Sequence, residues 1–358
     1  MIDRAVIGAW VGSSNLGDEL IFSILLRLLK EKGVKVSVPS VDPVKTSESF
    51  DVDSFSHINF FEFEKQLAES DALVFGGGGL LQNETGIWNL PFHLRRISAA
   101  RKQNIPWVGI GLGASGLKGE RALKQVSNKF KGHLGVSVRD ETSAQILESL
   151  NIPNVVRAAD LGWLWNVSDE VPPVSSSGFL GVSLRNPQTS RFLPAAVGPK
   201  ASMPEREIIN LAESINAVAI STGLSVRFIS LNKDEDAQLH QRVADKLQVD
   251  SELLNPDLST LEQCFDGVEA IVTMRYHAGL MGALKGAGVV CLPFSKKLDS
   301  LVSSLGAAAS KADTNNLVSV VESVLSARSE LDEHVENLQN RSQNNVEIIE
   351  LLDGTNDL

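Results

Sequence analysis

The sequence predicts an α/β protein with two doubly wound parallel sheets that face each other across a cleft. Short apolar strands alternate with helices along the chain, which is typical of parallel sheets covered by helices. The alternation stops at residues 167–178 and then restarts; two prolines, several serines and no periodicity indicate a linker there. The chain has 358 residues, which is long for a single core, so two domains are expected.

In the first half, the expected strands are 4–10, 35–39, 72–75, 106–110, 134–138 and 155–159. The helices expected between them are 19–32, 90–103 and 141–150. Asp18 and Asp140 precede two of these helices and are the expected N-caps, because their short side chains can accept hydrogen bonds from free backbone N–H groups. Residues 40–60 are polar and lack periodicity, so they are expected to be irregular.

In the second half, the expected strands are 179–184, 225–230, 270–273 and a final strand at 289–293. The expected helices are 205–222, 235–247, 260–265 and 330–352. The last helix is longer than the second core needs. The predicted organisation is therefore a first domain at 1–168, a second domain at 178–328 and a C-terminal segment at 329–358.

Composition restricts the classes of function. The net charge of −11 argues against a general nucleic-acid-binding surface. Cys264 and Cys291 are far apart and no histidine has metal-ligand spacing, so a reducing compartment and no metal site are expected. The longest apolar run, 20–29, is too short to span a bilayer, and the N-terminus does not have the pattern of a signal peptide. These features predict a cytoplasmic location.

Four glycine- or serine-rich loops follow predicted strands of the first domain: 12–18, 76–83, 111–116 and 137–143. Such turns let backbone N–H groups approach a ligand, and a helix N-terminus favours an anion. Any one of them can also be an ordinary turn. The first loop has no GxGxxG spacing and no Walker lysine, which disfavours dinucleotide and P-loop sites.

The stretch 271–290 is the strongest candidate for chemistry. A β-branched strand leads into Arg275-Tyr276-His277 and then into a helix of small residues, so these side chains should lie at the ligand-binding edge of the sheet. Arg139 and Arg185 follow other predicted strands. Each arginine has two ordinary roles, a structural salt bridge or an anion clamp; three at strand ends favour the clamp.

Other residues near strand ends leave alternatives open. His277 can be a general acid, a helix cap or a core residue. Lys296 and Lys297 follow the last predicted strand and either add charge on the same side or form a solvated pair. Asp160 also follows a strand and is the acid hardest to explain as a cap.

Several motifs in series resemble the polysaccharide pyruvyltransferase family, with the bacterial cell-wall branch as the nearest likeness. They are GSSNLGDEL, GGGGLLQNETG, VGIGLGASG, SVRDETSAQILESL, RAAD and TMRYHAGLMGAL, spread over about residues 7 to 300. The resemblance implies a GT-B-like fold whose C-terminal helix crosses back to the first domain. The chain departs from the family at Asn83, at Ala114 and in LGWLW after Asp160, which bears on the acceptor sugar more than on the reaction.

The resemblance implies an enzyme that transfers pyruvate from phosphoenolpyruvate to two hydroxyls of a sugar, forming a cyclic ketal. His277 matches the family's histidine and would be the general acid. The expected donor-binding residues are Arg139, Arg185, Arg275, Tyr276, Lys296 and Lys297. The expected acceptor-binding residues are Ser14, Asn15, Asp18, Gly78, Gly79, Gln82 and Asn83. No cofactor, metal or nucleic acid is expected.

The acceptor remains open between free, nucleotide-linked and lipid-linked sugars. A lipid-linked acceptor would place the enzyme at the inner face of the plasma membrane, with peripheral contact at most. Two other functions are retained: a GT-B-type glycosyltransferase that uses a nucleotide sugar, and an inactive module that binds sugars or anions. Retention of both Arg275 and His277 disfavours the inactive module.

Overall fold

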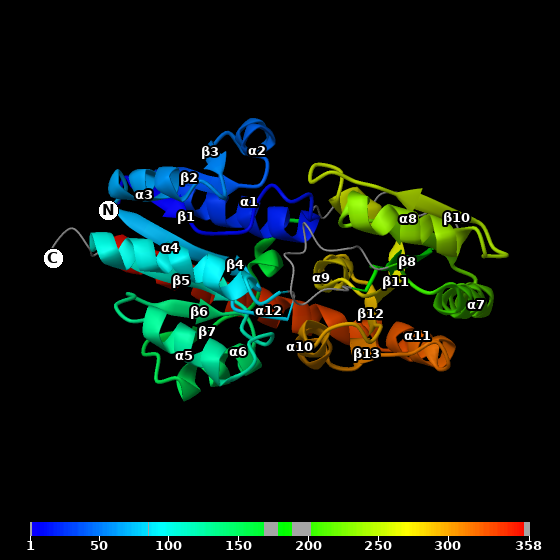
Figure 1. Cartoon of the computed structure of the whole chain (residues 1–358). Coiled ribbons are helices and arrows are strands. Elements are labelled where there is room, and N and C mark those ends of the chain that lie inside the picture. Colours follow the sequence, from blue (N-terminus) through cyan, green and yellow to red (C-terminus); the bar gives the residue numbers. More distant parts are fainter. Residues whose placement is uncertain (1, 85, 168–177, 188–201, 354–358) are drawn as a thin grey trace.

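The computed structural model describes residues 2–84, 86–167, 178–187 and 202–353. Two parallel sheets lie side by side, each covered by helices (Figure 1). We call each sheet with its covering helices a domain. The predicted linker and the loop after Arg185 fall mostly outside the described residues.

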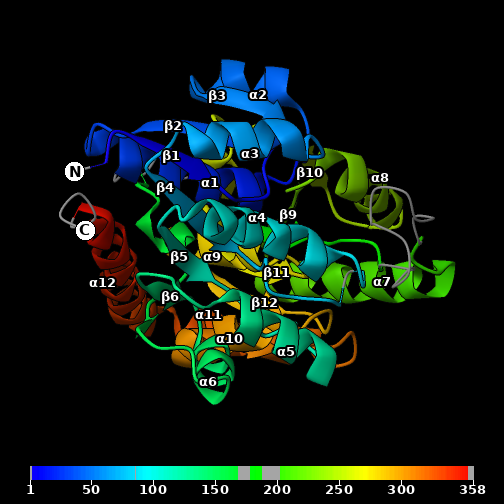
Figure 2. The same cartoon turned by 60° about the vertical axis from the view of Figure 1, so that its left-hand side comes forward.

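The first domain contains a seven-stranded sheet with the order β3-β2-β1-β4-β5-β6-β7. Its strands are β1 Arg4–Ile7, β2 Lys35–Ser40, β3 Asp53–Ser56, β4 Ala72–Gly78, β5 Trp107–Leu112, β6 Val136–Val138 and β7 Val155–Arg157. Its helices are α1 Leu16–Glu31, α2 Pro43–Phe50, α3 Phe60–Ala68, α4 Asn89–Gln103, α5 Glu120–Lys129, α6 Glu141–Ser149 and the 3-10 turn η1 Leu161–Leu164. Helices α3, α4 and α5 lie together over one face of this sheet (Figure 2).

The second domain contains a six-stranded sheet with the order β10-β9-β8-β11-β12-β13. Its strands are β8 Phe179–Ser183, β9 Ser225–Ile229, β10 Ser251–Leu254, β11 Val268–Thr273, β12 Gly288–Cys291 and β13 Ala309–Lys311. The helical elements are α7 Glu205–Thr222, α8 Lys233–Ala244, η2 Glu262–Phe265, α9 Tyr276–Leu284, α10 Lys297–Ser304, η3 Gly306–Ala308, α11 Leu317–Ser326, η4 Arg328–Glu330 and α12 Leu331–Glu350.

Three expectations about local structure are wrong. Residues 40–60 are not irregular, because they form α2, β3 and the start of α3. Helix α1 is capped by Asn15, whose side chain accepts from the N–H of Gly17, so Asp18 lies inside the first turn. The strand at 289–293 is not the last, since β13 pairs with β12 at the sheet edge. Asp140 does cap α6, as expected, by accepting from the N–H of Ser143 at 2.7 Å.

The last helix, α12, lies against the first domain. Oδ1 of Asn345 accepts from the Ser137 hydroxyl at 2.7 Å, and its amide donates to the Ala159 carbonyl at 3.0 Å. The Ser342 hydroxyl donates to the carbonyl of Asp160 at 2.9 Å. One apolar core cluster includes residues of α1, α9 and α12, so the two sheets share a continuous core. Within the described part of the chain, no helix has the length and apolar character needed to cross a bilayer.

Candidate active site

Two helix N-termini meet at the interface between the domains. Helix α1 follows β1, and α9 follows β11, so both begin at the carboxyl edges of their sheets. The N–H of Leu16 donates to the carbonyl of Leu231 in the second domain at 2.8 Å. A Cβ on Gly17 would lie 2.0 Å from Nδ1 of His277, so only glycine allows the imidazole to rest on this turn. Helix N-termini attract anions, so the junction of α1 and α9 favours a negatively charged ligand.

The imidazole of His277 faces a buried carboxylate. Its side chain is 13% exposed, and Nε2 lies 3.7 Å from Oδ1 of Asp160, which is longer than a hydrogen bond. Nε2 has no hydrogen-bond partner among the described residues. Oδ1 of Asp160 accepts from the N–H of Gly162 at 2.9 Å, so the carboxylate is fixed by η1. Burial alone would raise the pKa of Asp160, but His277 and Arg139 hold it below its ordinary value.

Arg139 lies at the end of β6 with its side chain only 2% exposed. Its Nη1 donates to Oδ2 of Asp160 at 3.0 Å. Nε lies 3.6 Å from Oδ2 of Asp140, an ion pair longer than a hydrogen bond, and Nε and Nη2 have no hydrogen-bond partner among the described residues. The guanidinium carbon lies 5.0 Å from the ring centroid of Tyr276. A Cβ on Gly113 would lie 2.6 Å from Nε, so glycine is needed beside it. Two donors of a buried cation are thus available to a ligand.

Lys297, the first residue of α10, extends its ammonium towards Gly79, close to the Arg139 guanidinium. A Cβ on Gly79 would lie 2.5 Å from its Nζ and 3.8 Å from Nη2 of Arg139. Burial and the nearby Arg139 lower the pKa of Lys297 to about 8. Its ammonium makes no ion pair or hydrogen bond with the described residues. Lys296 is exposed, so the two lysines are not the solvated pair that the sequence left open.

The other two arginines are engaged with acids of α8. Nη2 of Arg275 lies 3.0 Å from Oε2 of Glu235 and also pairs with Asp236. Nη2 of Arg185 lies 3.7 Å from Glu235. Burial and the nearby Arg275 lower the pKa of Arg185 to about 10, and its Nε has no partner among the described residues. Arg275 therefore has the contacts of a structural salt bridge, and Arg185 is partly available.

The expected acceptor residues are separated by the structure. Gly79 lies next to Lys297. Asp18 lies next to Gly78, since a Cβ on Gly78 would be 3.8 Å from Oδ1 of Asp18. Burial raises the pKa of Asp18, and His277 and Lys297 act against that rise. Two amides are engaged locally: Asn15 donates to Asp18 at 2.6 Å, and Asn83 bonds the backbone N–H and carbonyl of Lys118. The remaining members are Ser14, which lines a cavity, and Gln82, which is buried.

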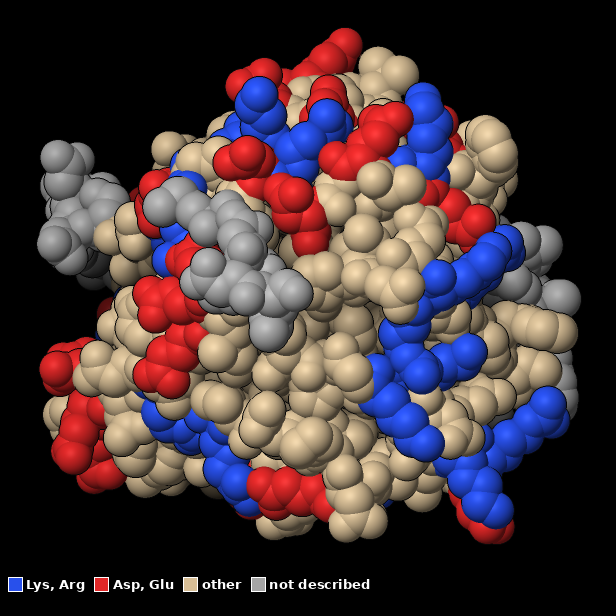
Figure 3. Space-filling view, turned by 90° about the vertical axis from the view of Figure 1, so that its left-hand side faces the viewer, with Lys and Arg blue, Asp and Glu red and all other residues tan. Residues whose placement is uncertain are grey.

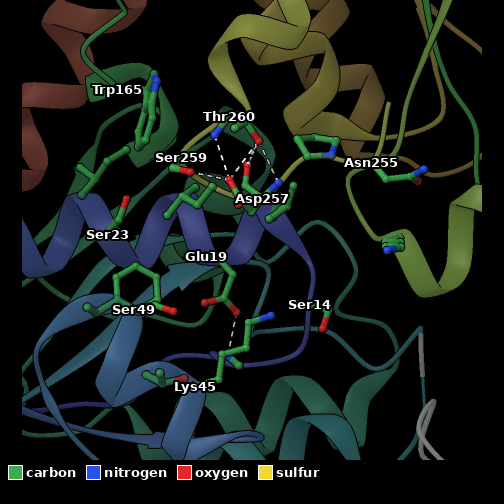
Figure 4. A pocket seen from close by; sticks show the side chains of 18 of the residues that line it. Ser14, Glu19, Ser23, Lys45, Ser49, Trp165, Asn255, Asp257, Ser259 and Thr260 are labelled. Atoms are coloured by element: carbon green, nitrogen blue, oxygen red, sulfur yellow. Dashed lines mark hydrogen bonds between the residues drawn. The ribbon is translucent and has the colours of Figure 1, made fainter. Parts of the chain in front are cut away.

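That cavity has a volume of about 1100 Å³ and lies between the domains on the other side of the first turn of α1 (Figure 4). Leu16 and Glu19 of this turn face it, whereas Gly17 touches His277. Glu19 accepts from the N–H of Gly12 at 2.7 Å, and burial raises its pKa to about 7. The wall also includes Ser14, Thr46, Ser49, Trp165, Asn255 and Thr260.

Sequence reasoning missed two parts of the site. Asp160 was recognised as unexplained, but its position between His277 and Arg139 depends on the packing of η1 against α9. Glu235 and Asp236 looked like ordinary acids of a helix start, and only the fold brings them to Arg275. Among the described residues, no three His, Cys, Asp or Glu side chains group as metal ligands.

Solved structures with the same architecture confirm the GT-B-like class. A UDP-GlcNAc 2-epimerase from Neisseria meningitidis bound to UDP-GlcNAc is 12% identical, with a TM-score of 0.60 over 98% of this chain and 99% of that chain. A putative UDP-N-acetylglucosamine 2-epimerase from Listeria monocytogenes is 9% identical, with a TM-score of 0.63 over 96% and 94%. A glycosyltransferase from Rickettsia africae is 12% identical, with a TM-score of 0.57 over 99% and 97%. At such identities the likeness shows the fold alone.

A comparison of the sequence with models of protein families identifies the family. The model described as polysaccharide pyruvyl transferase matches residues 15–295, which is most of the chain and includes Arg139, Arg185 and His277. The chain therefore belongs to the polysaccharide pyruvyl transferase family and is an enzyme of polysaccharide biosynthesis. A comparison with curated protein sequences found no match.

Proposed function

We propose that the enzyme transfers the pyruvyl group of phosphoenolpyruvate to two hydroxyls of one sugar. The observation that carries this proposal is a set of cationic N–H donors beside His277 that have no hydrogen-bond partner among the described residues. Arg139 offers Nε and Nη2, and Lys297 offers its ammonium, beside Gly79 and Gly113, where a Cβ would collide with these groups. Phosphoenolpyruvate carries a carboxylate and a phosphate on one carbon, so it needs two adjacent cationic groups.

The three cations take different roles in this proposal. Arg139 presents a planar fork that suits a carboxylate or a phosphate, and Lys297 adds a point charge. Arg185, whose Nε has no hydrogen-bond partner among the described residues, would complete the donor site from the second domain. Arg275 has a structural role in this proposal, because it pairs with Glu235 and Asp236. Tyr276 contacts the Arg139 guanidinium and positions it, while exposed Lys296 lies outside the immediate site.

The reaction needs two C–O bonds to form and one to break. The first sugar hydroxyl attacks C2 of the enol, and a proton adds to C3, which turns the methylene into a methyl group. The C2–O bond to phosphate then breaks, and the second hydroxyl attacks C2 to close the ketal. Of the two hydroxyl protons, one is balanced by the methyl group and the other by the released phosphate. Proton transfer of this kind contributes on the order of 10²- to 10⁴-fold to the rate.

His277 is the proposed proton donor, with Asp160 as its positioning residue. Nε2 of His277 has no hydrogen-bond partner among the described residues and lies 3.7 Å from the Asp160 carboxylate, which would orient the imidazole. Asp18 is buried near His277 and Lys297, and we propose that it contacts the attacking hydroxyl.

The acceptor sugar is proposed to approach past the loop at Ser14, with further sugar units in the cavity. Its wall provides hydroxyl, amide and aromatic groups, including Ser14, Asn255 and Trp165, and these groups suit a glycan that carries many hydroxyls. Trp165→Ala should then raise the KM of an oligosaccharide acceptor more than that of its single terminal sugar.

The test is product analysis by mass spectrometry. The enzyme is incubated with phosphoenolpyruvate and a panel of hexose and N-acetylhexosamine acceptors, free, nucleotide-linked and lipid-linked. The expected product is a sugar that has gained a pyruvyl ketal with release of phosphate. Glycosyl transfer from a nucleotide sugar, with no ketal on any acceptor, would replace the proposal with a glycosyltransferase.

A further inference from the structure

Positive charge is concentrated on one side of the first domain. Residues 89–131, from the start of α4 to just past α5, contain nine Lys and Arg but only one acidic residue, Glu120, in a chain with 33 basic and 44 acidic residues. Arg96 is buried. The other eight are at the surface: Arg95, Arg101, Lys102, Lys118, Arg121, Lys124, Lys129 and Lys131. The local net charge is therefore opposite to that of the whole chain.

Most of these cations pair with no acidic side chain of the residues that the structure describes. Lys118 pairs with Glu84 at 2.5 Å and Lys124 with Glu120 at 2.6 Å; the other six pair with no acid in the described part of the chain. Figure 3 shows Lys and Arg side chains gathered in a stripe along one side of the end of the first domain. An unpaired, one-sign stripe on an acidic protein points to an anionic partner.

Exposed apolar side chains lie at the N-terminal end of the same helix layer, where the guanidinium carbon of Arg95 lies 3.8 Å from the ring centroid of Phe60. At the N-terminal ends of α3 and α4, Phe61 is 80% exposed, Ile58 70%, Trp88 62% and Ile87 49%. The two helix starts are adjacent, since the rings of Phe60 and Phe92 are 5.6 Å apart. Phe61 and Trp88 are the only large aromatic residues among the exposed hydrophobic residues of the described chain. We call these four apolar residues, with the eight surface cations, the α4–α5 face.

We propose that the α4–α5 face docks on an anionic phospholipid membrane. Trp and Phe are stabilised at the level of lipid headgroups, and Lys and Arg are attracted by anionic lipids. A nucleic acid would account for the cations but not for exposed Ile58 and Ile87. The net charge of −11 repels the rest of the molecule from such a surface, so the contact is confined to one orientation.

The position of the α4–α5 face relates membrane docking to the proposed active site. Helices α3 and α4 follow β3 and β4, so their N-terminal ends lie at the carboxyl edge of the first sheet, the edge that carries the proposed active site. Docking through Phe61 and Trp88 therefore brings that edge towards the lipid surface. This inference does not depend on the transfer reaction, but it favours a lipid-linked acceptor for it.

The experiment is vesicle co-sedimentation of the full-length protein. Vesicles of phosphatidylcholine alone are compared with vesicles that also contain phosphatidylglycerol, at low and high salt. Binding is expected only to the anionic vesicles and is expected to weaken with salt. Lys102→Glu/Lys131→Glu should weaken it at least about ten-fold. The matched control, Lys35→Glu/Arg206→Glu, changes net charge equally at exposed positions elsewhere and should bind like wild type.

The apolar residues of the α4–α5 face are tested by a second variant with its own matched control. Trp88→Ser should weaken binding to anionic vesicles several-fold, whereas Ile220→Ser, at a position 66% exposed in α7, should leave it unchanged. Several results would overturn the proposal: equal binding to both vesicles, no binding to anionic vesicles, or equal losses in both charge pairs. Dimerisation without lipid that Trp88→Ser abolishes would instead assign the face to a second copy of the chain.

Discussion

Nε2 of His277 lies 3.7 Å from Oδ1 of Asp160, and Oδ2 of the same carboxylate accepts from Arg139 at 3.0 Å. One buried carboxylate thus links the proposed proton donor to the proposed donor clamp. His277 comes from the second sheet, and Asp160 and Arg139 from the first. The interface between the two domains therefore brings these three side chains together.

Asp160→Asn should reduce kcat by about 10²-fold or more, because the amide no longer presents a carboxylate oxygen to His277 and to Arg139. Stability should also fall, by about 1–3 kcal/mol of unfolding free energy, since Arg139 loses the carboxylate that Nη1 binds and keeps only Asp140, 3.6 Å from Nε. Denaturant unfolding and steady-state kinetics measure the two effects. Unchanged kcat in a folded variant would rule out Asp160 as a positioning residue.

Gly17→Ala tests the contact between the first turn of α1 and His277. Alanine is preferred to glycine inside a helix by about 1 kcal/mol, so the backbone of α1 should tolerate it. The new Cβ would lie 2.0 Å from Nδ1 of His277 and must displace the imidazole. The expected result is a strong loss of kcat with little change in the thermal unfolding midpoint. Wild-type kcat would show that the imidazole position does not matter.

The affinity for phosphoenolpyruvate should depend on the charge of Lys297. Its pKa is lowered to about 8, so the ammonium is mostly charged at pH 7 and mostly neutral at pH 9. Binding of the anionic donor should weaken as pH rises through 8, because only the charged form attracts it. Lys297→Arg is the control, since an arginine stays charged over this range. An equal pH dependence in both proteins would contradict the role given to Lys297.

Arg275→Met should act mainly on stability. Asp236 is completely buried, and Arg275 is the cation paired with it, so removing the arginine leaves a buried carboxyl without its counter-charge. The expected loss is about 3–5 kcal/mol of unfolding free energy. The double change Arg275→Met/Asp236→Leu should recover much of it, because it removes both charges. Full stability in the single variant, with donor binding abolished, would instead make Arg275 part of the clamp.

The fold could be predicted further than the site. Alternating strands and helices indicated parallel sheets, and α7 begins and ends where the pattern predicted. The stretch 40–60 was missed because α2 has eight residues with only Thr46 buried, so no apolar stripe reveals it. Its signal is local, in the cap at Asp42 and the proline at the first helical position.

The site required the tertiary structure. The strand-end rule brought Arg139 and His277 to one cleft, but it could not tell a clamp from a salt bridge. That distinction depends on partners distant in sequence, as Asp236 is for Arg275 and Asp160 for Arg139. Lys296 and Lys297 are neighbours in the chain, and only the register of α10 turns one outward and the other towards Gly79.

The most direct measurement is a calorimetric titration of the enzyme with phosphoenolpyruvate in the absence of any acceptor. Binding needs no knowledge of the sugar, so a negative result cannot be blamed on the wrong acceptor. Saturable 1:1 binding is predicted at pH 7, weakened at least about ten-fold by Lys297→Ala and by Arg139→Lys. Lys296→Ala, one residue away and exposed, should bind like wild type. No heat with phosphoenolpyruvate, together with tight binding of a nucleotide sugar, would contradict the proposed donor site.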